Sequence, residues 1–582
     1  MASRSLKAAL GLLLASETLA QSTTETVWSS FAFVLHGERT PLQGKLDPSL
    51  TPLGAQQLYS QGQLFRARYL SNSSLSDEDN SLTTNSPITG IEQQALDNTQ
   101  LSIFSTTDDF VTGSALAFIQ GLYPPVTRSF AYSNGGVNAS TLANGTQIEF
   151  PLDGYQYPNI QTLSATDPNS MGLEGQAGCT EYWISSGDAT SEAAVQQLYN
   201  STLDFYQSTW TEVFPNTLPK VMLSYDYAYD LWDYAQYAYD HSNASRDALG
   251  ADRLATLRAY ATSQQTNLNG NLSASGLRSG DQIRAVAGRT LAGKVVSQLS
   301  TNIASGGSTN KLTLMFGTFE PLLSFFALSE LVDLPTTTVF QQLPDPGAAA
   351  AFELFSTDSA GGANASYPAR DDLWVRFVYR NGTGADAPFT EYPLFGQGNS
   401  ATRMRYSDFV DGINEFAIKD VASWCGVCDA VTLFCSALSS DTQGSSGGVS
   451  NGSNNSNAAL SPAVAGVIGA VVTLAVLGLA TTTAFVFGGV RLRRADAGHR
   501  ASLGGFKGAE KMASDHDVSI VKNGARHERI GSWELGGPGP AAGTAPAAEG
   551  GASAFGASVG RKGDDDGDSI VGRAPVKPTE GV

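Results

Sequence analysis

One apolar segment, residues 462–490, constrains the topology of this chain more than any other feature. It contains no charged side chain over 29 positions, and as a helix it is long enough to cross a hydrocarbon core of roughly 30 Å with some tilt. Arg491 and two further arginines follow it closely, whereas residues 442–461 carry no charge. Because positive charge stays on the cytoplasmic side of a membrane, the sequence predicts a single-pass type I protein whose tail, residues 491–582, lies in the cytoplasm.

The N-terminus has the pattern of a secretory signal peptide. Residues 1–20 place Arg4 and Lys7 before an apolar run, and the pattern predicts cleavage near Ala20. A lipid-anchor signal also ends in an apolar tail, but about ninety residues follow the segment 462–490, and this argues against such processing. We therefore expect the chain in the secretory pathway, at the plasma membrane or the vacuolar membrane.

The charge balance excludes one class of partner. The chain holds 35 Lys and Arg against 55 Asp and Glu, which gives a net charge of −20. Residues 21–490 alone hold 20 basic and 42 acidic side chains. Such a surface repels the phosphates of nucleic acids at long range, so no nucleic-acid partner is expected.

Asparagines in N-glycosylation triplets occur only before the apolar segment. This one-sided distribution supports a luminal or extracellular ectodomain. The candidate acceptors are Asn72, Asn138, Asn144, Asn200, Asn243, Asn271, Asn364, Asn381, Asn451 and Asn454.

Four cysteines, Cys179, Cys425, Cys428 and Cys435, also precede the apolar segment. An even number on the oxidising side of a membrane predicts two disulfides, and three connectivities are open. A zinc site is the alternative, since Cys425 and Cys428 form a C-x-x-C pair. Zinc needs four ligands, however, and only Cys435 is close to this pair.

Composition divides the chain into an ectodomain, a stalk and a tail. Residues 439–461 are rich in Ser, Gly and Asn and predict a flexible stalk, which leaves residues 21–438 as the ectodomain. The tail, residues 491–582, is rich in Gly, Ala, Pro and Ser and is expected to be disordered. We expect no metal site and no cofactor.

Strands and helices alternate at the start of the ectodomain. Residues 29–35 form an apolar run that stops at His36, which predicts a buried strand ending in a loop. A helix is expected next, with Thr51 as its N-cap and Pro52 at its first position. Residues 100–104 then have the pattern of another strand leading into a helix.

The alternation returns at the end of the ectodomain. Residues 283–299 have helical periodicity, and a strand-like run at 312–316 precedes a helix that Pro321 opens. This order predicts an α/β fold with a mostly parallel sheet flanked by helices. Ligands of such sheets bind beyond the carboxyl ends of the strands, where His36 and Glu320 both fall.

The residues around His36 resemble a known family. The run VLHGERTP, residues 34–41, is similar to the R-H-G-x-R-x-P motif of the histidine acid phosphatases, which form branch 2 of the histidine phosphatase superfamily and include the phytases. Residues 50–57, 105–109 and 121–125 also resemble that family. The likeness extends over roughly residues 28–436.

The resemblance implies a phosphoglycerate mutase-like fold. Its α/β core would come from residues 24–125 and 281–438, with a mainly helical cap, residues 126–280, inserted between them. Catalysis in the family uses a histidine nucleophile, arginines that hold the phosphoryl oxygens, and a late His-Asp pair whose acid protonates the leaving group. By this likeness His36 matches the nucleophile and Arg39 the second arginine of the motif.

Three positions depart from the family pattern. Leu35 stands in place of the first arginine, Phe110 in place of the mid-chain arginine, and Phe319 in place of the late histidine. Glu320 stands where the acid of the late pair belongs and, as a carboxylic acid, still has a proton to donate. Loss of one oxyanion donor costs roughly 10²–10³ in rate, so these three replacements predict near-complete inactivity.

Two functions remain open at this point. The first is a pseudophosphatase, a membrane-anchored glycoprotein acting in binding, sensing or cell-surface structure. The second is an active acid phosphomonoesterase that works through a phosphohistidine on His36. The ligand would be a phosphomonoester or another small molecule, and the sequence indicates no particular protein partner. An arginine such as Arg128 or Arg289 within reach of His36 would favour the enzyme.

An aromatic and acidic segment, residues 225–240, has no assigned role in this scheme. Its tyrosines and Trp232 are expected to pack within the cap, because aromatic-rich helices usually do so. Its aspartates, including Asp230 and Asp233, are expected on a solvated face. His241 is expected on the cap surface.

Overall fold

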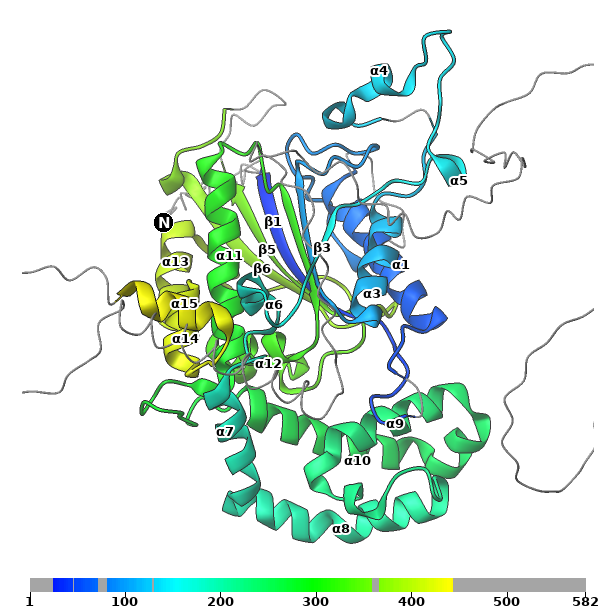
Figure 1. Cartoon of the computed structure of the whole chain (residues 1–582), viewed down its shortest axis with the longest axis vertical. Coiled ribbons are helices and arrows are strands. Elements are labelled where there is room, and N and C mark those ends of the chain that lie inside the picture. Colours follow the sequence, from blue (N-terminus) through cyan, green and yellow to red (C-terminus); the bar gives the residue numbers. More distant parts are fainter. Residues whose placement is uncertain (1–24, 45–46, 72–80, 128–129, 358–365, 443–582) are drawn as a thin grey trace, which may run out of the picture. The chain divides into compact units, whose positions relative to one another are not determined.

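The structure is a computed structural model that describes residues 25–44, 47–71, 81–127, 130–357 and 366–442 (Figure 1). The predicted signal peptide, the apolar segment 462–490 and the tail lie outside these residues, as does most of the predicted stalk. Within the described part of the chain, no helix is both long and apolar enough to cross a membrane.

The described residues form an eight-stranded sheet and helices on both of its faces. The strands are β1 (Thr26–Leu35), β2 (Leu101–Thr106), β3 (Ile160–Leu163), β4 (Leu312–Gly317), β5 (Ala349–Ser356), β6 (Leu373–Arg380), β7 (Thr390–Tyr392) and β8 (Arg403–Arg405). The helices are α1 (Pro52–Tyr69), α3 (Asp109–Leu122), α4 (Gly136–Ser140), α5 (Pro151–Gly154), α6 (Met171–Glu174), α7 (Thr180–Asp188), α8 (Ala193–Val213), α9 (Ala228–His241), α10 (Asn243–Asn269), α11 (Val286–Ala304), α12 (Glu320–Leu328), α13 (Tyr406–Asn414), α14 (Val421–Cys428) and α15 (Leu433–Thr442).

The sheet is mixed, which corrects the prediction of a mostly parallel one. The strand order is β3-β2-β4-β1-β5-β6-β7, and β8 also pairs with β6. Neighbours from β3 to β1 run parallel, whereas every pair from β1–β5 onward is antiparallel. The described residues between β5 and β6 contain no α-helix, and antiparallel neighbours need no crossover helix.

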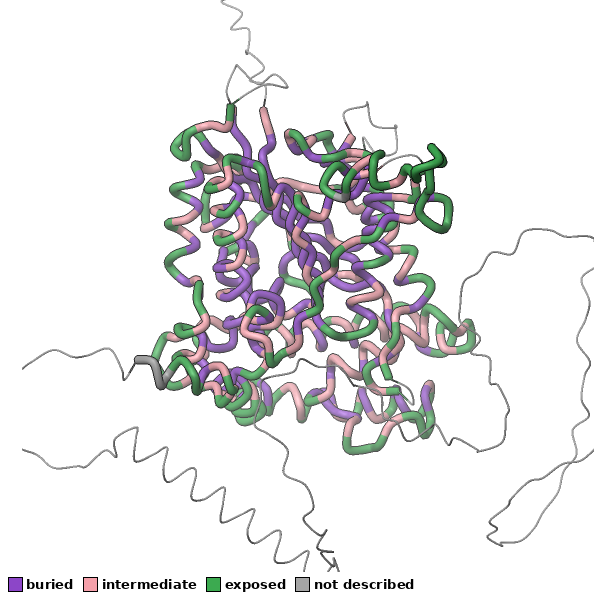
Figure 2. The backbone as a smooth tube through the Cα atoms, turned by 45° about the horizontal axis from the view of Figure 1, so that its top comes forward, coloured by how far each residue is buried: buried purple, intermediate pink, exposed green. Residues whose placement is uncertain are grey.

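Alternate residues of β1 are buried on opposite faces of the sheet. Phe31 and Phe33 pack in an apolar core with residues of α11 and α12. Ala32 and Val34 pack on the other face with residues of α1 and α3. Burial follows the strands and the inner sides of these helices (Figure 2). A sheet covered on both faces explains why this strand is apolar at almost every position.

The predicted start of the first helix is confirmed. α1 begins at Pro52, and the Thr51 hydroxyl oxygen accepts a hydrogen bond from the Gly54 amide at 3.0 Å. A threonine N-cap satisfies one of the free amides at a helix start, and proline at the first position needs no donor. The sequence therefore determines where the chain turns back after the loop that carries His36.

Helices α7 to α10, the cap, follow the first half of the sheet in sequence (Figure 1). Within the cap, α8, α9 and α10 enclose their own apolar core, in which Tyr206, Trp210 and Tyr225 are buried. The range expected for the cap, residues 126–280, also contains β3, which pairs with β2 in the core sheet. The helical cap is therefore shorter than that range.

Two disulfides involve the C-terminal helices, and one of them joins these helices to the start of the cap. Cys179, just before α7, pairs with Cys428, and Cys425 pairs with Cys435. This settles the connectivity that the sequence left open. All four thiols are consumed, so the alternative zinc site has no ligands left among them.

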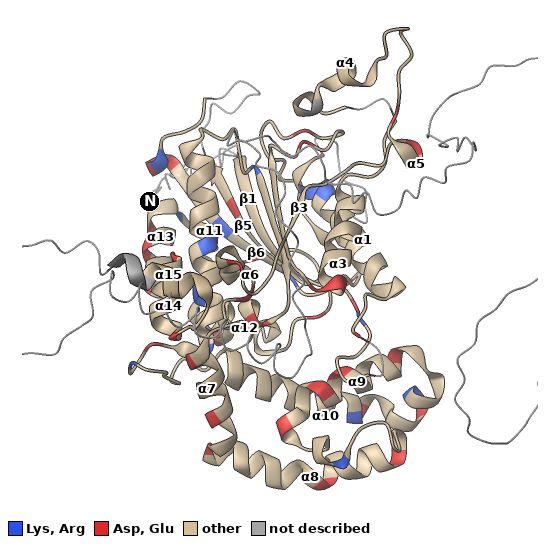
Figure 3. Ribbon diagram, in the orientation of Figure 1, with Lys and Arg blue, Asp and Glu red and all other residues tan. Residues whose placement is uncertain are grey.

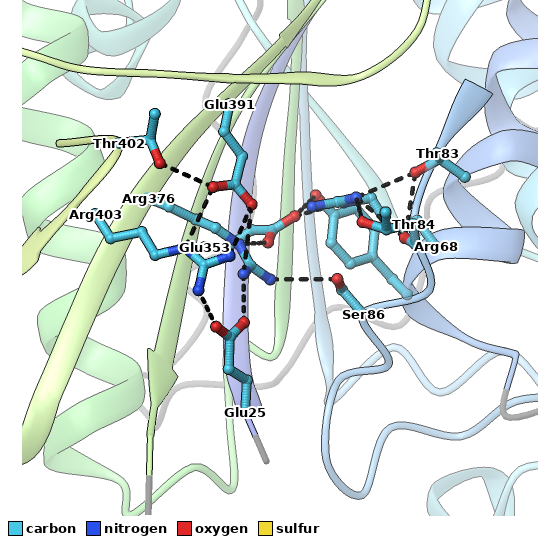
Figure 4. Close-up of polar contacts among 11 residues, drawn as sticks. Glu25, Arg68, Thr83, Thr84, Ser86, Glu353, Arg376, Glu391, Thr402 and Arg403 are labelled. Carbon is cyan, nitrogen blue, oxygen red and sulfur yellow. Dashed lines mark hydrogen bonds and ion pairs between the residues drawn. The ribbon is translucent and has the colours of Figure 1, made fainter. Parts of the chain in front are cut away.

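A buried carboxylate links the two halves of the core (Figure 4). Glu353 of β5 is fully buried and accepts hydrogen bonds from Arg68 Nε at 2.6 Å, from the Tyr69 hydroxyl at 2.7 Å and from Arg376. Burial alone would raise the pKa of Glu353, but Arg68 and Arg376 outweigh it and lower this pKa to about 2. The charged network thus joins α1 to β5 and β6 inside the protein.

Replacing this carboxylate is expected to destabilise the fold. Glu353→Gln leaves Arg68 buried without a counter-charge among the described residues, and removal of one partner from a buried ion pair costs about 3–5 kcal/mol. Arg376 keeps its ion pair with Glu25 at 2.6 Å. The lowered pKa means that the carboxylate stabilises the protein above about pH 4.5 and that this stabilisation is lost as the pH falls through about 2. Urea unfolding at pH 7 and pH 3 measures both effects.

A matched control is Glu212→Gln, because Glu212 pairs with Arg253 on the surface with both side chains exposed. Surface pairs contribute about 0–1 kcal/mol. If Glu353→Gln cost no more than this control at pH 7, the buried network would not carry the stability assigned to it.

Candidate functional site

The carboxyl ends of parallel strands bring the predicted site residues to one edge of the sheet. β1 and β4 are paired so that Leu35 lies opposite Gly317, and β2 flanks the other side of β4. His36 directly follows β1, and Glu320 begins α12 three residues after β4. The prediction that both residues fall at strand ends is confirmed.

Two glycines hold the loop after β1 against the start of α1. A Cβ atom at Gly37 would lie 2.3 Å from the carbonyl oxygen of Gly54, and one at Gly54 would lie 2.1 Å from that of Glu38. Neither distance is possible for a real side chain, so both positions require glycine. Their close contact fixes the turn on which His36 stands.

His36 is buried and is held as a neutral imidazole. Its Nδ1 lies 2.7 Å from the carbonyl oxygen of Gly37, and since a carbonyl only accepts, Nδ1 carries the proton. Burial and the nearby charge of Arg39 lower the pKa of His36 to about 3. The other nitrogen, Nε2, therefore keeps its lone pair at every pH above this value.

Arg39 is buried and makes its contacts with the cap. Its Nη1 donates to Asp233 Oδ2 at 3.0 Å and to the Thr40 carbonyl at 3.1 Å, and its Nη2 donates to the Tyr229 hydroxyl at 3.3 Å. Its guanidinium lies over the Phe110 ring, 5.5 Å from the centroid. Burial works to lower the pKa of Arg39, but Tyr229 and Asp233 outweigh it and the pKa is raised. The cation is thus fixed and paired.

Glu320 lies beside these residues in a group of carboxyls. Burial raises its pKa, and the Asp108 carboxylate adds to the rise, while Thr318 and Arg39 oppose it. Its Oε2 atom is buried and has no hydrogen-bond partner among the described residues. Glu174 of α6 has its pKa raised to about 7, first by burial and then by Asp108 and Glu320. Two carboxyl groups with raised pKa values, those of Glu320 and Glu174, therefore interact beside the site.

A cavity of about 500 Å³ opens at His36 and Arg39 and is bounded by the cap. The core supplies the loop after β1 and parts of the loops 343–346 and 381–387. One face of α9 supplies the other wall, with residues at helical spacing: Tyr229, Trp232, Asp233, Gln236, Tyr237 and Asp240.

The charges of this cavity are predominantly negative. Five carboxylates line it, those of Glu38, Asp233, Asp240, Asp345 and Asp386, against two arginines. Both arginines are paired, because Arg258 of α10 donates to Asp345 Oδ1 at 2.6 Å just as Arg39 donates to Asp233. Acidic side chains also stand along the cap helices (Figure 3).

The three positions that depart from the family pattern lie around His36. Leu35 and Phe319 line the cavity. Phe110 packs edge-on against the His36 ring at 4.8 Å between centroids and also contacts Arg39. Glu320 is not among the residues that line the cavity, although the charge of Arg39 acts on its carboxyl group and works to lower its pKa. Apolar side chains therefore lie near the histidine at the three positions where the pattern that the sequence resembles has two arginines and a histidine.

The aspartates of α9 were expected on a solvated face, and this is wrong for two of them. Asp233 binds Arg39, and Asp230 Oδ1 accepts from Gln43 at 3.1 Å, so both face the loop after β1. The helical spacing of Tyr229, Trp232 and Asp233 was a signal for one shared face, but no local pattern identifies its partner. His241 is partly exposed, as expected, and contacts Glu38 at 3.0 Å.

Of the two arginines proposed from the sequence, the one that the structure describes does not line the cavity. Arg289 donates to the carbonyls of Phe416 and Asp281, and Arg128 lies outside the described residues. Arg258, which does line the cavity, was not predicted from the sequence. Its position at the cavity depends on how α10 packs within the cap. No group of side chains suited to a metal ion occurs in the described ranges.

The glycosylation candidates divide by their surroundings. Asn138, Asn144, Asn200 and Asn243 are exposed, and Asn271 is half-buried. Asn381 lines the cavity and donates to Asp345 Oδ2 at 2.9 Å, so its amide is engaged. The remaining four, Asn72, Asn364, Asn451 and Asn454, lie outside the described residues. Glycosylation stays a prediction.

The raised pKa of Glu174 predicts how the stability of the protein depends on pH. Glu174 has its folded pKa raised to about 7 from 4.5, so stability is lost as the pH rises between these values. Glu174→Gln removes this loss. We expect the variant to melt a few degrees higher than the native chain at pH 8 but not at pH 4.

Thermal melts at both pH values measure this difference. The exposed Glu415→Gln serves as the control and is expected to show the same offset at both pH values. An equal offset for Glu174→Gln at pH 4 and pH 8 would contradict the raised pKa.

Comparisons with known proteins give a family match. A family model described as histidine phosphatase superfamily (branch 2) matches residues 15–380. No curated protein matches the chain.

Solved structures that match include two phytases and a multiple inositol polyphosphate phosphatase. The phytase of Citrobacter braakii has 14% identity and a TM-score of 0.42, covering 68% of this chain and 99% of its own. The phytase of D. castellii has 13% identity and a TM-score of 0.40, covering 73% and 86%. The multiple inositol polyphosphate phosphatase of Bifidobacterium longum has 14% identity and a TM-score of 0.34, covering 66% and 92%.

Proposed function

The chain belongs to branch 2 of the histidine phosphatase superfamily, and from this premise we propose that it is a pseudophosphatase, a member that binds a ligand without hydrolysing a phosphoester. One observation carries the proposal: the two arginines that line the cavity are both paired with carboxylates of the protein. A phosphoryl group would therefore meet no free guanidinium among the described cavity residues.

The charge around His36 supports the same conclusion. A phosphoryl group in its transition state needs fixed positive charge on its oxygens, and each missing donor costs roughly 10²–10³ in rate. Leu35 and Phe319 offer only hydrocarbon to the cavity, and three of its five carboxylates remain beyond those paired with the arginines. The rate losses from missing donors are not additive. The apolar walls and the carboxylates all disfavour the binding of a phosphate dianion in the cavity.

The same cavity suits a different kind of ligand. Leu35, Phe319 and Trp232 give it apolar and aromatic walls. A small apolar or aromatic molecule would bury surface there without requiring positive charge. This supports a role in binding, sensing or cell-surface structure.

The location of the protein is part of the proposal. Residues 1–20 act as a secretory signal, residues 462–490 anchor the chain as a single-pass type I protein, and residues 491–582 face the cytoplasm. The ectodomain would be a glycoprotein in the lumen or outside the cell, at the plasma membrane or the vacuolar membrane. Support comes from the one-sided glycosylation triplets and the charge distribution of the sequence, and from the two disulfides.

A second candidate is an active acid phosphomonoesterase. The neutral imidazole of His36, which carries its proton on Nδ1, favours this candidate. Its Nε2 lone pair would attack phosphorus while the bond to the leaving oxygen breaks, and that oxygen would take a proton from Glu320. Water would then cleave the P–N bond and return a proton to Glu320, releasing phosphate and restoring the imidazole. Burial raises the pKa of Glu320, which favours the protonated acid that the first step needs.

Phosphate release by the purified full chain separates the two candidates. We expect no turnover above that of His36→Ala for a broad panel of phosphomonoesters at pH 5 and pH 7. His241→Ala is the matched control, because it removes a histidine of the cap that contacts Glu38 and does not itself line the cavity. Turnover that persists in His241→Ala and disappears in His36→Ala would establish the enzyme and refute the pseudophosphatase.

A further inference from the structure

The contact between Arg39 and Asp233 has the chemistry of an anion-binding site with the anion supplied by the protein. Asp233 Oδ2 accepts from Arg39 Nη1 at 3.0 Å and from the backbone amide of Leu42 at 2.8 Å. A guanidinium and a backbone amide converging on one oxygen are the donors that bind a phosphate oxygen. The carboxylate of Asp233 thus makes the bonds that an external oxyanion would make.

The pair is shielded from water, which strengthens it. The Arg39 side chain is only 5% exposed and that of Asp233 15%. Arg39 also has a buried Nε atom without a hydrogen-bond partner among the described residues, so its donors are not all satisfied by the cap. An oxyanion that entered the cavity would find a suitable cation there, but one already bound to a carboxylate.

Several other contacts keep Asp233 in place. On the same helix, Tyr229 accepts from Arg39 Nη2, and Asp230 accepts from Gln43. At the end of α9, His241 contacts Glu38 at 3.0 Å. Because α9 is attached to the loop after β1 at several points, the Asp233 carboxylate is held at a high effective concentration next to Arg39.

From these contacts the structure assigns a role to Asp233: it is a specificity-determining residue, a built-in anion that occupies the phosphate position on Arg39 and excludes external oxyanions from the cavity. The inference rests on the proposed function and deepens it, since it names the residue that makes the cavity reject phosphate. It also implies that the cation of the motif is masked by the cap and has not lost its ability to bind an oxyanion.

The test is titration of the full chain with inorganic phosphate at constant ionic strength, followed by calorimetry. Asp233→Asn retains the size of the side chain and removes its charge, and Asp233→Ala empties the position. We expect both variants to bind phosphate at least tenfold more tightly than the native chain. Adding Arg39→Gln to either variant is expected to abolish the gain, which assigns it to the guanidinium.

Asp230→Asn is the matched control, because it removes the same charge from the same helix, keeps an oxygen that accepts from Gln43, and alters a residue that forms no hydrogen bond with Arg39. We expect it to bind phosphate as the native chain does. An equal gain in Asp230→Asn would overturn the proposal, because the effect would then be one of overall charge. No gain in either Asp233 variant would also overturn it, and so would loss of the fold in both, which thermal melts report.

These results are independent of the test of the proposed function. His36-dependent turnover in the native chain would refute the pseudophosphatase whatever the phosphate affinities are. Absence of turnover together with unchanged phosphate affinity in the Asp233 variants would refute only the role of Asp233.

Discussion

The ion pair between Arg39 and Asp233 determines how the site of this protein is built. It joins residues 194 positions apart, one on the loop after the first strand and one on a cap helix, and it is largely shielded from water. Burial makes a charged pair expensive to separate, because either partner alone would be left without compensation. The pair therefore attaches the cap to the core and, by the same contact, neutralises the charge of Arg39 at the wall of the cavity.

A second network of buried charged residues joins the elements of the core. Glu353 accepts from Arg68 and Arg376, which lie on α1 and β6. α1 is the helix whose start packs against the turn of His36 through Gly37 and Gly54. A constraint on α1 is therefore also a constraint on the position of the histidine.

Much of this organisation could be predicted from local sequence. Thr51 and Pro52 marked the start of α1, and the strand ends correctly placed His36 and Glu320 at one edge of the sheet. The antiparallel half of the sheet could not be predicted, because β5 is buried at every position and a short buried strand has no alternation that reveals its partners. The result is a mixed sheet instead of a mostly parallel one.

The site was less predictable than the fold for the same reason. Sequence alone predicted that Leu35 and Phe110 stand where the motif that it resembles has arginines, because a motif has a fixed spacing. The partner of Arg39 was not, because Asp233 reaches it only through the docking of α9, and the pairing of Cys179 with Cys428 likewise spans 249 residues. Contacts that depend on how the cap meets the core leave no local pattern.

The central claim, that Arg39 is committed to the cap and the cavity rejects oxyanions, is tested most directly by an experimental structure of the native chain determined with a high concentration of orthovanadate. The account predicts that Asp233 remains on Arg39 and that no vanadate is found beside His36. Vanadate bonded to Arg39 and close to His36 Nε2, with Asp233 displaced, would contradict it.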